Sequence, residues 1–474
     1  MSLRSLGTTF GLVARNATSR SLGAVVNLLT GAATGIMVAR HLGPAGFGQF
    51  SVVWAATWAL APLVSVGLDR LLVREIPRNI GIVDLRRGLR VAAIMGPLAG
   101  AGLLLATWWI GASQEVLLAT ACAGLYLATS GLVVTLDAVF SASERMGLGT
   151  VVQVVESVAA LAGVVAVIMS GGGLVPISIA LTAGRLAHLL VSAVVVHSSR
   201  GLTTRPMNLE APPLSHLIRT SMPIAGSRTL SEGIARSDVV LLGLLVAPSD
   251  VGLYSATVVV SLYIPQLLRE YDQALFPALA RARSLTHSGL AVVFRQTWRA
   301  YLVVAVAAAA GLAVLAPEVL ELLYDSSFVS AAPILVILTA TVPLRLLAGL
   351  CATTLDATNR QVTRMAVTAV ALATKLVLVP LLVILFGIAG AAVASVVAEL
   401  VLLAGMLVPF RGLWPLRWGH TAEAIVIGAT VAAVAFLTPG HVLVRIAAGV
   451  GIFAVLAALI WRRASDAPTE GGAV

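Results

Sequence analysis

The chain has 474 residues, of which 59% are hydrophobic and 11% are charged, with 31 Lys and Arg against 21 Asp and Glu. Soluble domains carry about 25% charged residues, because they must cover a large surface with polar groups. The composition therefore excludes a soluble enzyme and a disordered scaffold, and it predicts a polytopic membrane protein. The net charge of +10 does not indicate nucleic-acid binding, since the arginines recur between apolar runs instead of forming one basic patch.

Apolar runs of about 17–25 residues are long enough to cross a bilayer as helices. In chain order they lie at 17–39, 47–68, 91–111, 116–138, 148–170, 174–197, 220–246, 251–277, 300–323, 331–355, 364–386, 388–409, 422–437 and 442–461. These runs predict an all-α integral membrane protein with fourteen transmembrane helices.

The arginines predict the orientation of these spans. When the N-terminus is placed in the cytoplasm, the loops that then face the cytoplasm hold nearly all the arginines outside the spans, and the outer loops hold only Arg40. Positive loops stay on the cytoplasmic side of a membrane. Both termini are therefore expected in the cytoplasm.

The chain matches itself at an offset of 204 residues, where residues 42–51 lie over residues 246–255. In both copies a proline and a glycine form an outer turn, and an aromatic residue and a serine begin the next span. Six spans separate the copies, so both copies face the same way, and a parallel repeat about the membrane normal is predicted. The predicted domains are an N-terminal lobe (1–199), a cytoplasmic linker (200–219), a C-terminal lobe (220–409), two further spans (410–463) and a disordered tail (464–474).

The outer turn of the first copy carries a family resemblance. Residues 39–48, ARHLGPAGFG, are similar to the ARxLGPxGFG turn of the polysaccharide-transport flippases, which belong to the multidrug/oligosaccharidyl-lipid/polysaccharide (MOP) superfamily. Further similar segments follow in the order of that family, at 67–70, 251–255, 323–328 and 387–392.

The resemblance implies two pseudo-symmetric six-helix lobes around a central cavity, with two extra C-terminal helices. It also implies a transporter and not an enzyme, located in the bacterial plasma membrane. The expected activity is the flipping of an undecaprenyl-diphosphate-linked oligosaccharide to the outer leaflet for cell-surface polysaccharide synthesis, by alternating access. The expected partners are this lipid-linked substrate, membrane lipids and other polysaccharide-assembly membrane proteins, with no nucleic acid.

Charged side chains inside the spans are the candidate functional residues, because each costs about 2.5–3.5 kcal/mol at the centre of a helix. In span 220–246, Arg228, Glu232 and Arg236 fall within an arc of about 80° on one helix face. They are expected either to form a cationic wall of the cavity or to pair with each other and support packing. Asp238 points away from that face and is expected to pack against another helix.

Three more cations lie near the middle of their spans, namely Arg345, Lys375 and Arg185. Arginine offers a fixed fork of donors that suits phosphate oxygens. We therefore expect Arg345 and Lys375 to bind the substrate diphosphate, and we expect Arg185 either to do so or to support the lobe interface. His188 is interpreted as structural.

The acids inside the spans are interpreted as gating, pairing or coupling groups. Arg269, Glu270 and Asp272 carry both signs close together, which is typical of ion pairs or of a gate. Glu399 is deep enough in its span to bind a coupling ion, either a proton or sodium. Asp137 and Asp356 lie near the cytoplasmic ends of their spans and are expected to be solvated.

Other motifs are absent from the sequence. There is no Walker loop, Cys122 and Cys351 lie far apart in apolar runs, and no cluster indicates a metal or cofactor site. Two alternatives within the superfamily remain, a lipid II flippase and an ion-coupled multidrug antiporter. A membrane polysaccharide polymerase or ligase is the alternative of another class, although the short outer loops disfavour it.

Overall fold

A computed structural model of the chain describes residues 3–65, 82–143, 145–198, 214–285, 287–413, 418–439 and 441–465. Within these ranges every regular element is a helix, as the composition predicts. The first helices are α1 (Leu3–Ser65), α3 (Ile82–Trp109), α4 (Gln114–Ala142), α5 (Met146–Met169), α6 (Leu174–Ser198), α8 (Leu214–Leu245), α9 (Pro248–Leu285) and α10 (His287–Val314). They are followed by α11 (Ala316–Leu323), η2 (Ser326–Ala331), α12 (Ala332–Thr339), α13 (Thr341–Ala357), α14 (Gln361–Leu407), η3 (Val408–Leu413), α15 (Trp418–Leu437) and α16 (Val442–Ser465).

The chain divides into two compact units. Unit 1 comprises Met1–Ser255 and Lys375–Pro380, and unit 2 comprises Ala256–Thr374 and Leu381–Val474. The predicted lobes remain a prediction. Most of the predicted linker (residues 200–213 of 200–219) and most of the tail (residues 466–474 of 464–474) lie outside the described residues.

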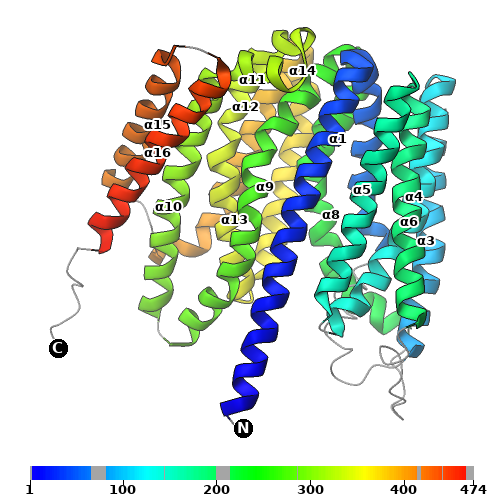
Figure 1. The fold of residues 1–474 in the computed structure, drawn as a ribbon, viewed down its shortest axis with the longest axis horizontal. Coiled ribbons are helices and arrows are strands. Elements are labelled where there is room, and N and C mark those ends of the chain that lie inside the picture. Colours follow the sequence, from blue (N-terminus) through cyan, green and yellow to red (C-terminus); the bar gives the residue numbers. More distant parts are fainter. Residues whose placement is uncertain are drawn as a thin grey trace. The chain divides into compact units, whose positions relative to one another are not determined.

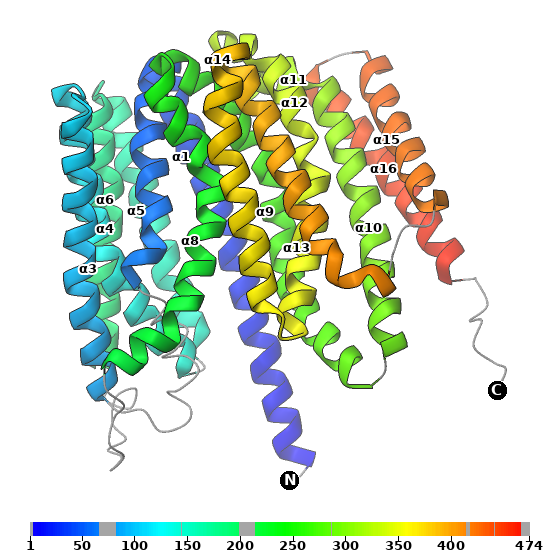
Figure 2. The same cartoon turned by 180° about the vertical axis from the view of Figure 1, so that it is seen from behind.

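Unit 1 is a bundle in which α3 packs along α4, α5 packs along α6, and α1 contacts α4, α5 and α8, as Figures 1 and 2 show. The helices approach closely where glycines replace larger side chains. A Cβ atom on Gly100 of α3 would lie 2.6 Å from the carbonyl oxygen of Gly124 on α4. Small residues at such contacts are typical of helix packing in membranes.

Unit 2 is built around α10, which contacts α12, α13 and α15, while α15 packs against α16. Its core contains Phe294, Trp298 and Tyr301 of α10, all at most 3% exposed. Phe294 stacks on Phe410 with ring centroids 5.2 Å apart. The aromatic side chains of one helix therefore fill the space between its neighbours.

Nine helices of the described residues are long and apolar enough to cross a membrane. The apolar segments of α15 and α16 in the described part are shorter, at Ala422–Leu437 and Val442–Val455. Two long helices each hold two predicted spans, because α1 has a non-helical residue at Gly43 (φ 64°) and α14 has one at Gly387 (φ 61°). Both glycines adopt the left-handed region that L side chains avoid. The number fourteen stays a prediction.

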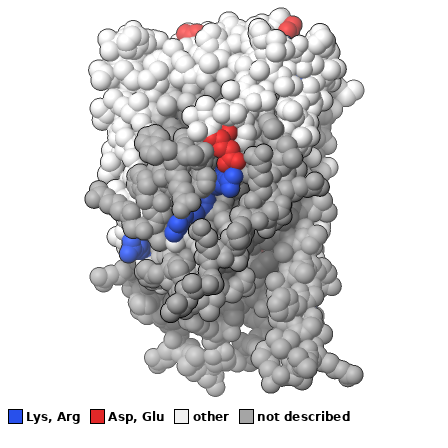
Figure 3. Space-filling view, turned by 90° about the vertical axis from the view of Figure 1, so that its left-hand side faces the viewer, with Lys and Arg blue, Asp and Glu red and all other residues white. Residues whose placement is uncertain are grey.

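The exposed surface is apolar, as a bilayer requires. Large hydrophobic side chains are widely exposed, including Trp109 at 82%, Met169 at 83% and Ile384 at 78%. On the face shown in Figure 3, the described side chains are almost all uncharged, and acidic and basic groups adjoin at one place. A soluble protein rarely exposes apolar area on this scale.

The repeat in the sequence corresponds to a reciprocal contact in unit 1. A Cβ atom on Gly48 would lie 1.8 Å from the carbonyl oxygen of Pro248, and one on Gly252 would lie 1.9 Å from that of Pro44. The offset of 204 residues pairs Gly48 with Gly252 and Pro44 with Pro248. Each copy thus places its glycine against the proline of the other, as two copies related by a twofold axis would.

Candidate functional site

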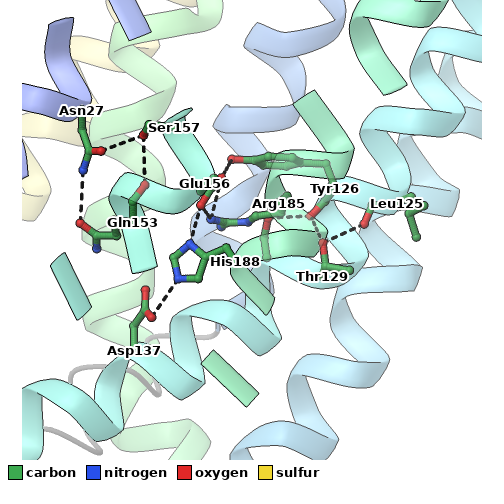
Figure 4. Close-up of polar contacts among 11 residues, drawn as sticks. Asn27, Leu125, Tyr126, Thr129, Asp137, Gln153, Glu156, Ser157, Arg185 and His188 are labelled. Atoms are coloured by element: carbon green, nitrogen blue, oxygen red, sulfur yellow. Dashed lines mark hydrogen bonds and ion pairs between the residues drawn. The ribbon is translucent and has the colours of Figure 1, made fainter. Parts of the chain in front are cut away.

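The polar side chains of unit 1 gather where α4, α5 and α6 pack together. We call Tyr126 and Asp137 of α4, Glu156 of α5, and Arg185 and His188 of α6 the Glu156 cluster (Figure 4). The helices place these side chains within reach of one another although they are separated along the chain. The sequence identifies each charged group in its span but does not indicate that they meet.

Arg185 and Glu156 form the central ion pair of the cluster. The Arg185 Nη1 atom lies 2.9 Å and 3.2 Å from the two carboxylate oxygens of Glu156. The guanidinium carbon also lies 4.8 Å from the centroid of the Tyr126 ring, as in a cation–π contact. Arg185 thus already has an acid and an aromatic face as partners.

His188 lies between two carboxylates. Its Nδ1 atom is 2.6 Å from Oε2 of Glu156, and its Nε2 atom is 3.0 Å from Oδ1 of Asp137. The His188 side chain is only 2% exposed, while those of Glu156 and Asp137 are about 20% exposed. Asp137, which was expected to be solvated, is partly exposed and also bonds to an imidazole that α6 brings against it.

Lys375 and Asp238 form a second, deeply buried pair in unit 1. The Lys375 Nζ atom lies 2.9 Å from Oδ2 of Asp238, and both side chains are 1% exposed. Lys375 also donates to the carbonyl oxygen of Ile234 at 2.6 Å, and the Tyr254 hydroxyl donates to Asp238 at 2.7 Å. Asp238 packs against other helices as expected. A role of Lys375 in substrate binding stays a prediction, and its charge is already balanced.

The other cations of α8 are more accessible. The Arg236 Nε atom donates to Glu232 at 3.0 Å, one helical turn away, and both side chains are 31% exposed. The guanidinium carbon of Arg236 lies 4.7 Å from the Trp58 ring centroid on α1. Arg228, on the same predicted face, is exposed. The common face expected from the spacing is confirmed for Glu232 and Arg236 by their bond.

In unit 2, the Arg345 Nε atom of α13 donates to Oε1 of Glu399 on α14 at 2.7 Å. The two side chains are 11% and 4% exposed. Two residues expected to play separate roles, substrate binding and ion coupling, are thus partners in one buried pair. Asp356, expected to be solvated, pairs with Arg364.

Some of the predicted site falls outside what the structure describes. The side chains of Arg269, Glu270 and Asp272 lie outside the described residues, so their predicted role in pairing or gating stays a prediction. Among the described residues, no group of three or more His, Cys, Asp and Glu side chains is arranged to hold a metal ion.

Comparisons with known proteins bear on the family and the fold. Residues 13–283 match the family described as polysaccharide biosynthesis protein. A comparison with curated proteins gives no match. The fold is similar to that of the lipid II flippase MurJ in an inward closed conformation, with a TM-score of 0.74 and 11% identity over 95% of this chain and 99% of that chain.

Other solved structures of the MOP superfamily share the fold. An inward-facing multidrug resistance MATE family transporter gives a TM-score of 0.62 at 16% identity, over 84% of this chain and 98% of that chain. A MOP superfamily transporter from Pyrococcus furiosus gives 0.55 at 15% identity, over 85% and 95%. The chain is therefore a multi-pass membrane protein with the MOP fold. Because the family match spans more than half of its residues, it belongs to the polysaccharide biosynthesis protein family.

Proposed function

We propose that the chain is a flippase that moves an undecaprenyl-diphosphate-linked oligosaccharide from the cytoplasmic to the outer leaflet of a bacterial plasma membrane. The observation that carries the proposal is the match of residues 13–283 to polysaccharide biosynthesis proteins, in a chain whose fold is that of the MOP transporters. In this function the protein moves its substrate and makes no covalent change in it.

The diphosphate is the part of the substrate whose crossing costs the most free energy, because an unpaired charge is unfavourable in the low-dielectric interior of the bilayer. Arg228 and Arg236 of α8 support this role, since both are accessible, at least in part, in the described structure. Two arginines against the single Glu232 leave a net positive charge on this helix face. We assign the first contact with the diphosphate to Arg228 and Arg236.

The buried cations would require a further step. Arg185, Arg345 and Lys375 are bonded to Glu156, Glu399 and Asp238, so a diphosphate must compete with a carboxylate to reach them. Arginine can hold two acceptors with its fork of donors, whereas a lysine ammonium is a point charge. Arg345 and Arg185 are accordingly better suited than Lys375 to contact their carboxylate and the diphosphate at the same time.

A lipid II flippase is the second candidate, favoured by the likeness to MurJ over 95% of this chain. The two candidates share a lipid diphosphate and differ in the sugar and peptide that it carries. The cations of α8 would serve either substrate, so the identity of the headgroup decides between them.

The test uses the purified protein in lipid vesicles that contain either a labelled undecaprenyl-diphosphate oligosaccharide or labelled lipid II. Movement of label between leaflets is measured by its accessibility to a membrane-impermeant quencher. We expect faster movement of the oligosaccharide lipid, loss of that movement in R228A/R236A, and partial recovery in R228K/R236K.

Arg299 provides the matched control, because it is partly exposed and paired with Glu423 but lies outside the predicted site. R299A should move the substrate at the wild-type rate. Movement of lipid II alone would favour the second candidate. Unchanged movement in R228A/R236A at normal abundance would contradict the role of the α8 cations.

A further inference from the structure

The Glu156 cluster contains an imidazole whose two nitrogens both face carboxylate oxygens. Figure 4 shows His188 between Glu156 and Asp137, with Arg185 on the other side of Glu156. The distances from the ring nitrogens to these oxygens, 2.6 Å and 3.0 Å, are those of hydrogen bonds. The substrate role proposed above does not use His188 or Asp137.

Two hydrogen bonds from the imidazole need two protons. A neutral histidine has one N–H donor and one bare nitrogen, and an ionised carboxylate only accepts. With His188 neutral and both acids ionised, one of the two contacts would bring two acceptors together. The observed geometry is satisfied when the cluster holds one additional proton, either on the imidazole or on a carboxyl group.

The charges of the cluster lead to the same number. Arg185 supplies one positive charge, and Glu156 and Asp137 supply two negative charges when ionised. Without an additional proton the cluster has a net charge of −1, at a place where the His188 side chain is 2% exposed and that of Arg185 is 13% exposed. One bound proton makes the cluster neutral, which removes the electrostatic cost of an unbalanced charge inside the bilayer.

The cluster extends from one end of the helices toward their middle. Asp137 is five residues from the C-terminal end of α4, about 8 Å along the helix. Glu156 is ten residues into α5, which begins beside that end, and is therefore about 15 Å along its helix. His188 connects the two acids, so a proton can pass from the outermost acid to a depth near the middle of an apolar slab about 30 Å thick.

The charged and polar groups that surround His188 make its imidazole the group best placed to carry the proton. The imidazole contacts Asp137 of α4 and Glu156 of α5. On its own helix, Arg185 pairs with Glu156. The Tyr126 hydroxyl of α4 also lies 3.5 Å from the Glu156 carboxylate. From α1, Asn27 reaches the neighbouring turn of α5, where it accepts from Ser157 at 2.7 Å. On α3, the described cations Arg86 and Arg90 are exposed.

We infer that Asp137, His188 and Glu156 bind one coupling proton, and that a pH gradient acting through this site drives the flipping proposed above. In the step itself, a proton from water adds to the His188 imidazole to form an imidazolium, and the same proton returns to water on the other side of the membrane. No other bond is made or broken. The inference rests on the proposed function for its second part alone.

The first test counts protons without transport. Purified wild-type protein, H188Q, D137N and the control S198A are taken through a drop in pH, and proton uptake is measured with an indicator dye. Ser198 is the control because it lies on α6, is exposed and carries no group that titrates in this range. We expect H188Q to take up one proton fewer per chain than either wild type or S198A. Equal uptake by wild type and H188Q overturns the proton site.

The second test applies a pH gradient to vesicles that contain the labelled lipid-linked oligosaccharide. For one coupled proton, a gradient of about two pH units can shift the leaflet ratio of substrate by about a hundredfold, since each unit is tenfold. H188Q should equilibrate substrate to a ratio of one with or without the gradient, and S198A should respond as wild type does. If H188Q is poorly folded, D137N serves in its place, because Asp137 is partly exposed.

The outcomes separate the two proposals. A wild-type protein that moves no lipid-linked substrate contradicts the proposed function. The measurement of proton uptake by purified protein still tests whether the Glu156 cluster binds a proton. A wild-type response to a sodium gradient at constant pH, with none to a pH gradient, overturns the coupling by protons. A full response to pH in H188Q assigns the cluster to packing alone.

Discussion

The buried pair of Lys375 and Asp238 allows a strong test of whether an intramembrane cation is structural. Both side chains are 1% exposed and their charged atoms are 2.9 Å apart. Removing one partner of a buried ion pair costs roughly 3–5 kcal/mol, because it leaves an uncompensated charge. The loss of stability in K375M should be at the lower end of this range, since Asp238 keeps the Tyr254 hydroxyl and the Val239 amide as donors. The loss in D238N should be at the upper end, because the Lys375 ammonium then has neutral acceptors such as the Ile234 carbonyl and no counter-charge from Asp238.

The double variant K375M/D238N separates structure from transport. Replacing a whole buried pair by neutral groups of similar size is often neutral or stabilising by about 1–4 kcal/mol. We therefore expect the double variant to recover most of the stability that each single variant loses, in a thermal unfolding measurement on purified protein. Transport should recover with stability. If K375M instead unfolds like wild type and loses transport, and the double variant stays inactive, Lys375 is a substrate ligand and the structural explanation is refuted.

Three further predictions address the helix contacts, the second unit and the topology. G48A should lower the abundance of the protein, because its Cβ would lie 1.8 Å from the Pro248 oxygen and overpacking costs about 1–3 kcal/mol. G102A is the control, because a Cβ at Gly102 would have nothing within 4 Å, and it should be neutral or slightly stabilising. R345M should destabilise by roughly 3–5 kcal/mol by leaving Glu399, 4% exposed, without its guanidinium, and R345M/E399Q should restore most of this in the same unfolding assay. A topology reporter fused after Pro248 should read outside and one fused after Thr204 inside, and the reverse at either position would contradict the predicted orientation.

The positions of the helices could be predicted because apolar runs are a local property of the sequence. The two runs around Gly43 and the two around Gly387 were distinguishable as spans, and in the structure each pair consists of two helices that meet directly at a kink, at one glycine of positive φ. A glycine can reverse the local backbone without a loop, and hydropathy alone does not distinguish that from a short turn.

The partners of the charged groups could be predicted only within one helix. Glu232 and Arg236 are four residues apart, so helical geometry alone brings them together. The pair of Asp238 and Lys375 and the contacts of His188 depend on how distant helices pack, which the spacing of residues does not contain. The one available signal for the Glu156 cluster was that the spans of α4 and α5 each hold an acid and that the next span, α6, holds bases.

The intramembrane charged groups differ in their ability to bind an anion or a proton, because their partners differ. A cation that is buried against a carboxylate, as Lys375 and Arg345 are, lowers the cost of its own burial, and an incoming anion must displace that carboxylate. A cation that is accessible and faces an aromatic ring, as Arg236 is, can add a phosphate without losing its first partner. An imidazole between two acids can take up and release a proton with little movement, since its donors already point at acceptors. The proposed anion binding is therefore best supported on α8 and the proposed proton binding in the Glu156 cluster, and the residues of both proposals lie in unit 1.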